Sequence, residues 1–312
     1  MILEEGRYTH ESVLLAETLE RLVTDKGGLY LDATLGLGGH SEALLNKLSA
    51  QGKVLGLDAD PEALAEAGHR LQAHSGKFHS VRSNFRSLGS VLEKEGFFPL
   101  TGAMFDLGVS SLQLDKPSRG FSFMREGPLD MRLGPDSTLT AEQIVNRWPA
   151  EQIAMLLKEF GEEPDADKIA RAIVSRRAIK PLSTTLELAA CVESVVPRTG
   201  HHPATRTFQA LRIAVNQELE ALTKGLESVI PFLKAEGRLC VITFHSLEDR
   251  IVKNVFASFV AQGSCVYIGK GDAKSAIAPS DAEIARNPRS RSAKLRVAER
   301  RGESATPRET RL

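Results

Sequence analysis

The stretch 29–48 constrains the fold of this chain more than any other. Its first three residues, Leu-Tyr-Leu, form a short apolar run typical of a buried parallel strand, and Asp32 ends that run. Three glycines follow: Gly36, Gly38 and Gly39. Apolar residues then recur at helical spacing over 41–48. A strand, a glycine-rich turn and a helix in this order predict the first unit of a doubly wound α/β sheet, where ligands bind outside the carboxyl ends of the strands.

The same turn indicates which ligand it could hold. A dinucleotide-binding turn reads G-x-G-x-x-G, and its third glycine lets helix and strand pack closely around a pyrophosphate. Here Ser41 occupies that third position, and His40 places a bulky side chain beside the turn. The carboxylate of Asp32 is an unfavourable neighbour for a diphosphate and suits a ligand with an ammonium group, such as the methionine part of S-adenosylmethionine. An ordinary strand–helix turn is the alternative interpretation.

A second strand is predicted over 52–58, and it ends at Asp58. Pro61 then fits the first turn of the next helix, with Asp60 as its cap. Asp58 lies about 20 residues beyond the glycine turn, where an acidic side chain accepts ribose hydroxyls in this architecture. The alternative is a solvated acid at the end of a strand.

Two further strands are predicted over 77–82 and 100–106. Phe85 follows the first of them and could lie against an adenine ring, although its spacing fits a core residue equally well. Polar residues follow the second strand, where the reacting group of a second substrate is expected: Asp106, Ser110, Ser111 and Gln113.

The alternation of strands and helices then stops. Four helical patterns follow, over 141–147, 149–160, 165–178 and 184–195. A run of helices within an α/β order predicts an inserted all-helical lobe. We therefore expect four parts: a first part of the sheet domain (1–115), the inserted lobe (116–202), a second part of the sheet domain (203–300) and a disordered tail (301–312).

The second part of the sheet domain opens with a predicted long helix over 203–222. A strongly apolar strand over 237–245 returns to the sheet, and the spacing of Ser246 and Asp249 resembles a capping box at the start of a helix. His245 ends that strand and is either a site residue or a structural histidine. The segment 263–280 is small and polar, so we expect it to be mobile, and a last strand is predicted near 294–299.

Charge and cysteine usage limit the classes of function. Lysine and arginine together number 40, and so do aspartate and glutamate together, so the formal net charge is zero. Any contact with nucleic acid must therefore come from local basic clusters. Two such clusters stand out: Arg171, Arg176, Arg177 and Lys180 in the lobe, and Arg286, Arg289, Arg291 and Lys294 near the end. Each could meet phosphates or be a solvated face. Cys191, Cys240 and Cys265 have no metal-type spacing, so reduced structural thiols and no metal site are expected.

The chain shows no pattern for export or membrane insertion. Its acidic start lacks the basic-then-apolar order of a signal peptide, and no apolar run approaches the ~20 residues of a membrane span. We therefore expect a cytoplasmic protein with neither a membrane nor DNA as a partner.

Together these segments resemble the bacterial MraW/RsmH family of ribosomal RNA methyltransferases. The resemblance covers most of the chain and rests on short motifs in the family's order and spacing: DATLGLGGHS (32–41), DLGVSS (106–111), QLD (113–115), RGFSFMR (119–125), GPLDMR (127–132), HPATRTFQA (202–210), FHSLEDRIVK (244–253), NPR (287–289) and RS (291–292).

This resemblance implies a Rossmann-like class I methyltransferase fold and S-adenosylmethionine-dependent methylation. The implied target is the exocyclic amine, N(4), of a cytidine near the P site in 16S ribosomal RNA of the small subunit. The family's cofactor-binding positions fall on Gly38, Gly39, His40, Asp58, Phe85, Asp106 and Gln113. Phe85 thereby becomes an expected adenine contact.

The chemistry of methyl transfer leaves the catalytic group open. Acceptors for the N–H groups of the cytosine amine could assist the reaction, and the candidates are Asp106, Ser110 and Ser111. The D/S/N-P-P-aromatic motif of many amino-methyltransferases is absent after the fourth strand. Two other classes remain as alternatives: a nicotinamide-dependent oxidoreductase, against which Ser41 and Asp32 argue, and a non-catalytic RNA-binding assembly protein.

Overall fold

The computed structural model describes residues 11–198, 200, 202–269 and 275–302. The chain divides into two compact units, one containing Met1–Gly108 with Glu220–Leu312 and the other containing Val109–Leu219. Residues 303–312 of the predicted tail lie outside the described residues. No helix within the described ranges is both long enough and apolar enough to cross a bilayer.

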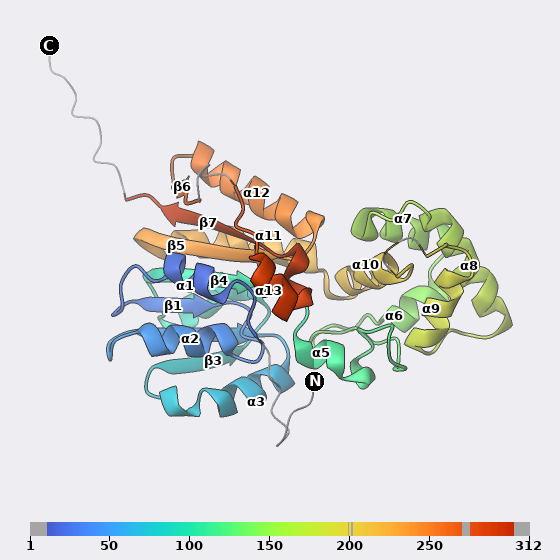
Figure 1. The fold of residues 1–312 in the computed structure, drawn as a ribbon, viewed down its shortest axis with the longest axis horizontal. Coiled ribbons are helices and arrows are strands. Elements are labelled where there is room, and N and C mark those ends of the chain that lie inside the picture. Colours follow the sequence, from blue (N-terminus) through green and yellow to red (C-terminus); the bar gives the residue numbers. More distant parts are fainter. Residues whose placement is uncertain (1–10, 199, 201, 270–274, 303–312) are drawn as a thin grey trace, which may run out of the picture. The chain divides into compact units, whose positions relative to one another are not determined.

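The first unit is built on a single sheet. Its strands, seven among the described residues, lie in the order β3-β2-β1-β4-β5-β7-β6 (Figure 1). Strands β1 to β5 are parallel, and β7 is antiparallel to both β5 and β6. The strands are β1 Leu29–Asp32, β2 Lys53–Asp58, β3 Phe78–Arg82, β4 Leu100–Asp106, β5 Leu233–Thr243, β6 Cys265–Tyr267 and β7 Lys294–Arg300. The predicted doubly wound α/β sheet is confirmed.

Helices cover both faces of this sheet because successive strand residues point to opposite sides. Tyr30 and Met104 belong to a core with α1, α2 and α3, whereas their neighbours Leu31 and Phe105 belong to a second core with α4, α11 and α12. The helices are α1 Leu15–Leu22, α2 Gly39–Lys47, α3 Pro61–Arg70, α4 Leu88–Glu95, α11 Glu218–Val229 and α12 Ser246–Ala261. Continuous apolar strands with two covered faces are typical of a parallel sheet.

The order of the strands reverses beside β1. The chain passes from β1 to β2 and β3 on one side, then returns to β4 on the other side of β1. The ends of β1 and β4 are tied together by the Ala33 N–H, which donates to Met104 O at 2.9 Å. Such a switch point is where doubly wound sheets bind ligands.

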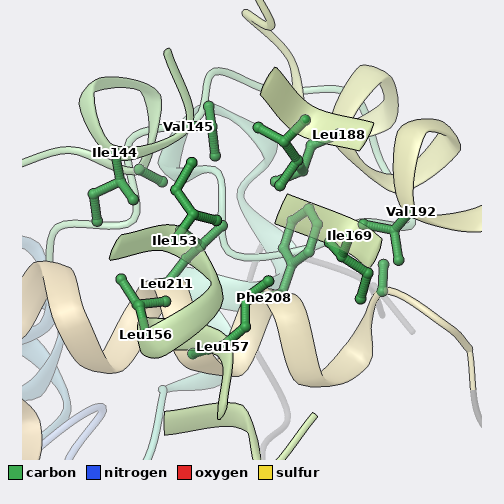
Figure 2. Packing of buried hydrophobic residues seen from close by; sticks show 14 of the residues in the cluster. Ile144, Val145, Ile153, Leu156, Leu157, Ile169, Leu188, Val192, Phe208 and Leu211 are labelled. Carbon is green, nitrogen blue, oxygen red and sulfur yellow. The ribbon is translucent and has the colours of Figure 1, made fainter. Parts of the chain in front are cut away.

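The second unit contains helices around its own core. They are α5 Ser111–Asp115, α6 Ala141–Arg147, α7 Ala150–Gly161, α8 Ala166–Ile179, α9 Thr185–Glu193 and α10 Thr205–Asn216. Figure 2 shows Leu157 of α7, Ile169 of α8, Leu188 of α9 and Phe208 of α10 in one apolar cluster. The predicted all-helical lobe is confirmed, but the compact unit is longer than the expected 116–202 because α5 and α10 belong to it.

The long helix predicted over 203–222 is wrong, because the structure has two helices there. Gln217 adopts a left-handed conformation (φ 50°, ψ 42°) that ends α10, and α11 begins at the next residue. Arg212 binds both carboxylate oxygens of Glu218 across this break, at 2.9 and 2.8 Å. This ion pair is largely buried on both sides, so it stabilises the break.

The break divides one apolar stripe between two cores. Phe208, Leu211 and Val215 pack in the helical unit, whereas Leu222 packs against the sheet. The sequence shows the continuous periodicity but contains no glycine or proline to mark the interruption.

Part of the segment expected to be mobile is instead a strand. Cys265–Tyr267 forms β6 and pairs with β7, with Val266 opposite Glu299. Valine and tyrosine favour strands, so composition carried this signal. A short helix, α13 Asp281–Arg286, and a 3₁₀ turn, η5 Pro288–Ser292, follow before β7.

All three cysteines are buried free thiols. Cys240 lies in β5, and burial raises the pKa of its thiol to about 12. A thiol with this pKa stays protonated at neutral pH and behaves as a small core residue.

Candidate functional site

The turn between β1 and α2 has a backbone that requires glycine. Gly36 and Gly38 have φ angles of 52° and 78°, and Gly38 lies at the N-cap of α2. A Cβ atom on Gly39 would lie 2.3 Å from Ser12 Oγ. The first two glycines are therefore required by conformation and the third by the close approach of the chain that precedes α1.

Gly39→Ala is expected to destabilise the protein by about 1–3 kcal/mol, because the added methyl group overlaps Ser12 Oγ. Gly68→Ala in α3 is the matched control, since a Cβ there meets no heavy atom within 4 Å. Alanine favours a helix over glycine by up to about 1 kcal/mol, so the control should be slightly stabilised. Thermal unfolding compares the two variants, and equal melting temperatures would argue against a tight turn.

Asp32 holds the shape of this turn from inside. Its side chain is almost fully buried, and its oxygens accept hydrogen bonds from Ser41 Oγ at 2.7 Å and from the Thr34 N–H at 3.2 Å. Burial raises the pKa of Asp32 to about 6. Ser41, which argues against a dinucleotide site, is therefore also the residue that anchors this carboxylate.

Asp58 joins the end of β2 to the glycine turn. Its Oδ2 accepts from the Gly36 N–H at 2.8 Å, and its Oδ1 accepts from the Asp60 N–H at 2.9 Å. Burial raises the pKa of Asp58 to about 6. A carboxylate offers about four acceptor sites, so these two bonds leave capacity for hydroxyl donors of a ligand.

Asp106, at the end of β4, has the most perturbed carboxyl group at this edge. Its Oδ1 is buried and has no hydrogen-bond partner among the described residues. Burial, with the negative charges of Asp32 and Glu248, raises the pKa of Asp106 to about 8. A cationic ligand or an N–H donor would give Oδ1 the partner that it lacks. Either would also favour the ionised form of the carboxyl group.

His40 lies beside Asp106 in a fixed orientation. Its Nε2 is 3.0 Å from Val13 O, and because a carbonyl oxygen only accepts, Nε2 carries the hydrogen. Its Nδ1 is 3.5 Å from Asp106 Oδ2. The imidazole therefore connects the start of α1 to the carboxyl group at the end of β4.

Phe85, which follows β3, packs partly in the core. It begins η2 Phe85–Ser87 and packs edge-on against Phe105, with ring centroids 5.8 Å apart. The residue is only partly buried, and its contact with an adenine ring stays a prediction.

Three candidate residues belong to the helical unit, where two of them form a helix cap. Ser110 Oγ accepts from the Gln113 N–H at 3.3 Å, and Gln113 Oε1 accepts from the Ser110 N–H at 3.0 Å. This reciprocal capping box starts α5, and both Ser111 and Gln113 are buried. Local structure therefore accounts for much of this Ser-Ser-x-Gln pattern.

Comparison with known proteins bears on these observations. A family model described as the MraW methylase family matches residues 7–301. The chain belongs to the MraW methylase family. The family resemblance predicted from the sequence motifs is thereby confirmed.

Several relatives carry the name ribosomal RNA small subunit methyltransferase H. One from Thermomicrobium roseum is 49% identical over 94% of this chain and 94% of its own length. Others from Halothermothrix orenii (44% identical, 93% and 98% covered) and Heliobacterium mobile (47% identical, 94% and 99% covered) are similar. The likeness thus spans nearly whole chains on both sides.

The sequence analysis missed one residue that assembles this site in the MraW methylase fold. Thr34 Oγ1 accepts from the Asp106 N–H at 2.6 Å, so it fixes the end of β4 against the end of β1. A hydroxyl residue two positions after a strand-end aspartate is the signal that could have indicated it.

The predicted cap at Ser246 and Asp249 is wrong. His245 is the N-cap of α12: its Nδ1 accepts from the Glu248 N–H, and Glu248 Oε2 accepts from the His245 N–H. The box is therefore shifted by one residue because an imidazole nitrogen replaces the usual hydroxyl or carboxylate. The structure gives His245 a structural role as this cap, and its role as a site residue stays a prediction.

Proposed function

We propose that this chain is an S-adenosylmethionine-dependent methyltransferase of the cytoplasm that methylates N(4) of a cytidine in the P-site region of 16S ribosomal RNA. The match to the MraW methylase family across residues 7–301 carries the proposal. The relatives named ribosomal RNA small subunit methyltransferase H support the class of substrate. The choice of a cytidine, and of its N(4) amine, as the target rests on the resemblance of the motifs.

The residues at the end of the sheet fit the proposed cofactor. The turn at Gly38 and Gly39 would accommodate its amino-acid part, and Asp58 would accept its ribose hydroxyls with the lone pairs left by its two backbone donors. Phe85 would contact the adenine. The unmatched Asp106 Oδ1 fits a ligand with positive charge. His40 and Gln113 complete the proposed set.

When bound, S-adenosylmethionine would supply a methyl group activated by a positively charged sulfur. The task of the protein is then to orient the cytosine amine and to exclude water. Among the candidates for accepting an amine N–H, Ser110 Oγ already caps α5, while Asp106 Oδ1 has unused acceptor capacity. These contacts favour Asp106 over Ser110 in that role. Ser111, buried in α5, stays a candidate.

Both basic clusters contain cations that already have partners within the protein; near the end of the chain, Arg286 pairs with Glu11 and Lys294 lies 3.6 Å from Asp249. In the helical unit, Arg177 donates to Val145 O and Lys180 binds Glu187 at 2.9 Å, which lowers the pKa of Glu187 to about 2. Near the end of the chain, Arg289 and Arg291 are exposed on η5. We propose the helical unit and the exposed arginines of η5 together as candidates for phosphate contacts of the RNA.

Asp58→Ala is expected to weaken binding of S-adenosylmethionine by about 1–3 kcal/mol, because ribose hydroxyls would lose their buried acceptor. Isothermal calorimetry measures the change. Glu66→Ala, which removes an exposed acid from α3, is the control and should bind like the wild type. Unchanged affinity in Asp58→Ala would remove this residue from the proposed site.

Transfer of a tritiated methyl group to small ribosomal subunits, followed by mass spectrometry of the nucleosides, tests the whole proposal. N(4)-methylated cytidine is the expected product. Labelling of another nucleoside would overturn the target, and absence of labelling with intact particles and precursors would favour the non-catalytic assembly protein. The comparisons lend no support to a nicotinamide-dependent oxidoreductase.

A further inference from the structure

A buried glutamate far along the sequence reaches the start of α1. Glu283 lies in the first turn of α13, which is capped by Ser280 Oγ, and only 7% of its surface is exposed. Its Oε1 accepts a hydrogen bond of 2.8 Å from the backbone N–H of Leu14, 269 residues away. Burying a carboxylate costs free energy unless it is hydrogen-bonded, so the bond to Leu14 offsets the cost of burying Glu283.

The N–H of Leu14 and the C=O of Val13 belong to one peptide group. That carbonyl oxygen accepts the hydrogen on His40 Nε2 at 3.0 Å, while the N–H donates to Glu283. A peptide group is planar, so fixing the direction of its N–H also fixes the direction of its C=O. A carboxylate bound to the N–H also polarises the group and makes the oxygen a better acceptor.

The backbone at this position needs such support. Leu14 has φ 51° and ψ 35°, a left-handed conformation that residues with a side chain rarely adopt, and its own side chain makes no cap bond to α1. Two exposed contacts add to the link, since Arg286 binds the Glu11 carboxylate at 3.1 Å and Asn287 donates to Glu11 O at 3.3 Å. Helix α13 and the residue that follows it thus hold the chain just before α1.

We propose that Glu283 is a positioning residue for the proposed cofactor site, acting through the Val13–Leu14 peptide on His40. The peptide keeps the hydrogen on His40 Nε2 and directs Nδ1 toward Asp106 Oδ2, 3.5 Å away. Through Glu283, the segment 281–292 therefore contributes to the cofactor site although it supplies none of the proposed cofactor contacts. This inference rests on the proposed function for its effect on binding, but its effect on His40 is independent of it.

The first test is spectroscopic and requires no ligand. The full chain with ¹⁵N-labelled histidine gives long-range ¹H–¹⁵N spectra, in which His40 is assigned from its loss in His40→Gln. The wild type should show hydrogen on Nε2, protected from exchange. Glu283→Ala should lose that protection, whereas Glu283→Gln, which keeps a carbonyl acceptor, should restore it. Arg286→Ala breaks only the exposed pair with Glu11 and is the matched control.

The second test is calorimetry with S-adenosylmethionine. We expect the Kd of Glu283→Ala to rise about tenfold, the loss of roughly one buried hydrogen bond, with Glu283→Gln much closer to the wild type. Unchanged His40 signals and affinity in a folded Glu283→Ala, with only a lower melting temperature, would overturn the inference. A wild type that does not bind the compound would refute the proposed function, while the spectra would still decide the role of Glu283.

Glu283→Gln decides the question if the alanine variant does not fold. It exchanges a charged acceptor for a neutral one, so the Leu14 amide proton and the His40 Nε2 proton should both shift. A shift confined to Leu14 would show that the peptide transmits nothing and would contradict the inference.

Discussion

Asp106→Asn is expected to change how the stability of the protein depends on pH. In the folded protein the pKa of Asp106 is raised to about 8, far above its ordinary value of 3.8. A raised pKa means that the protonated form favours folding, so the wild type loses stability as pH rises from about 4 through about 8. An asparagine cannot ionise, and the variant should be more stable than the wild type at pH 8 by a few kcal/mol.

The same comparison contains its own control. At pH 5 the Asp106 carboxyl group has ionised in the unfolded chain but not in the folded wild type, so the loss has only begun, and the gap between the two proteins should be smaller than at pH 8 by about 1.4 kcal/mol for each pH unit. Asp58, with its pKa raised to about 6, titrates alike in both. Chemical denaturation at pH 5 and pH 8 measures the difference. An equal gap at the two pH values would show that Asp106 is not the titrating group.

The folded protein without a ligand favours the protonated form of Asp106. Binding of a cation should reverse this preference, because positive charge favours the ionised carboxylate. The affinity of the wild type for S-adenosylmethionine is therefore expected to increase between about pH 6 and pH 8, with release of a proton near neutral pH. Asp106→Asn should bind about 1.5–3 kcal/mol more weakly above pH 8 and lose the pH dependence. Calorimetry in buffers of different ionisation enthalpy counts the protons. Equal proton release by the variant would contradict this account.

Phe208→Ala should destabilise the helical unit by about 3–5 kcal/mol, because it removes a buried ring from the cluster shown in Figure 2. Leu226→Ala in α11 is its matched counterpart, since Leu226 is fully buried against the sheet. Its expected cost is about 2–5 kcal/mol. The two residues lie on either side of the break at Gln217, so they report on different cores.

Hydrogen exchange resolved by peptide distinguishes the two effects. Phe208→Ala should speed exchange in α7 and α8, whereas Leu226→Ala should speed it in β4 and α4. If both variants accelerated exchange in the same peptides, α10 and α11 would be acting in one common core, and the division at Gln217 would have no energetic meaning.

Local sequence was informative wherever local rules decide the structure. The apolar run before Asp32, the glycines at 36–39 and the acid at Asp58 predicted strand, turn and strand end correctly, because β1 and β2 are short, apolar and bounded by residues that end strands. The helices of the lobe were predicted within a few residues because their apolar residues recur at helical spacing. The structure adds capping boxes at Thr140 and Thr184, each at the start of a helix.

Predictions failed where the partner of a segment decides its structure. β6 is held at the edge of the sheet by pairing with β7, and neither strand specifies the other in sequence. The cap at His245 depends on the side chain of Glu248, which accepts a hydrogen bond from the His245 N–H. Ser246 and Asp249 have the same spacing as His245 and Glu248, so the sequence predicted the capping box one residue too late. The break at Gln217 occurs because two halves of one apolar stripe enter two different cores.

The sequence by itself determined a doubly wound sheet, an all-helical lobe and the family, since these follow from apolar periodicity and from motifs in fixed order. Only the tertiary structure decided which charges and acceptors meet. His40 lies against Asp106, Thr34 ties β4 to β1, and Glu283 supports Leu14 from the far end of the chain. Such pairs join residues that are distant in sequence, and their geometry is set by how the strands and helices pack, which no local pattern records.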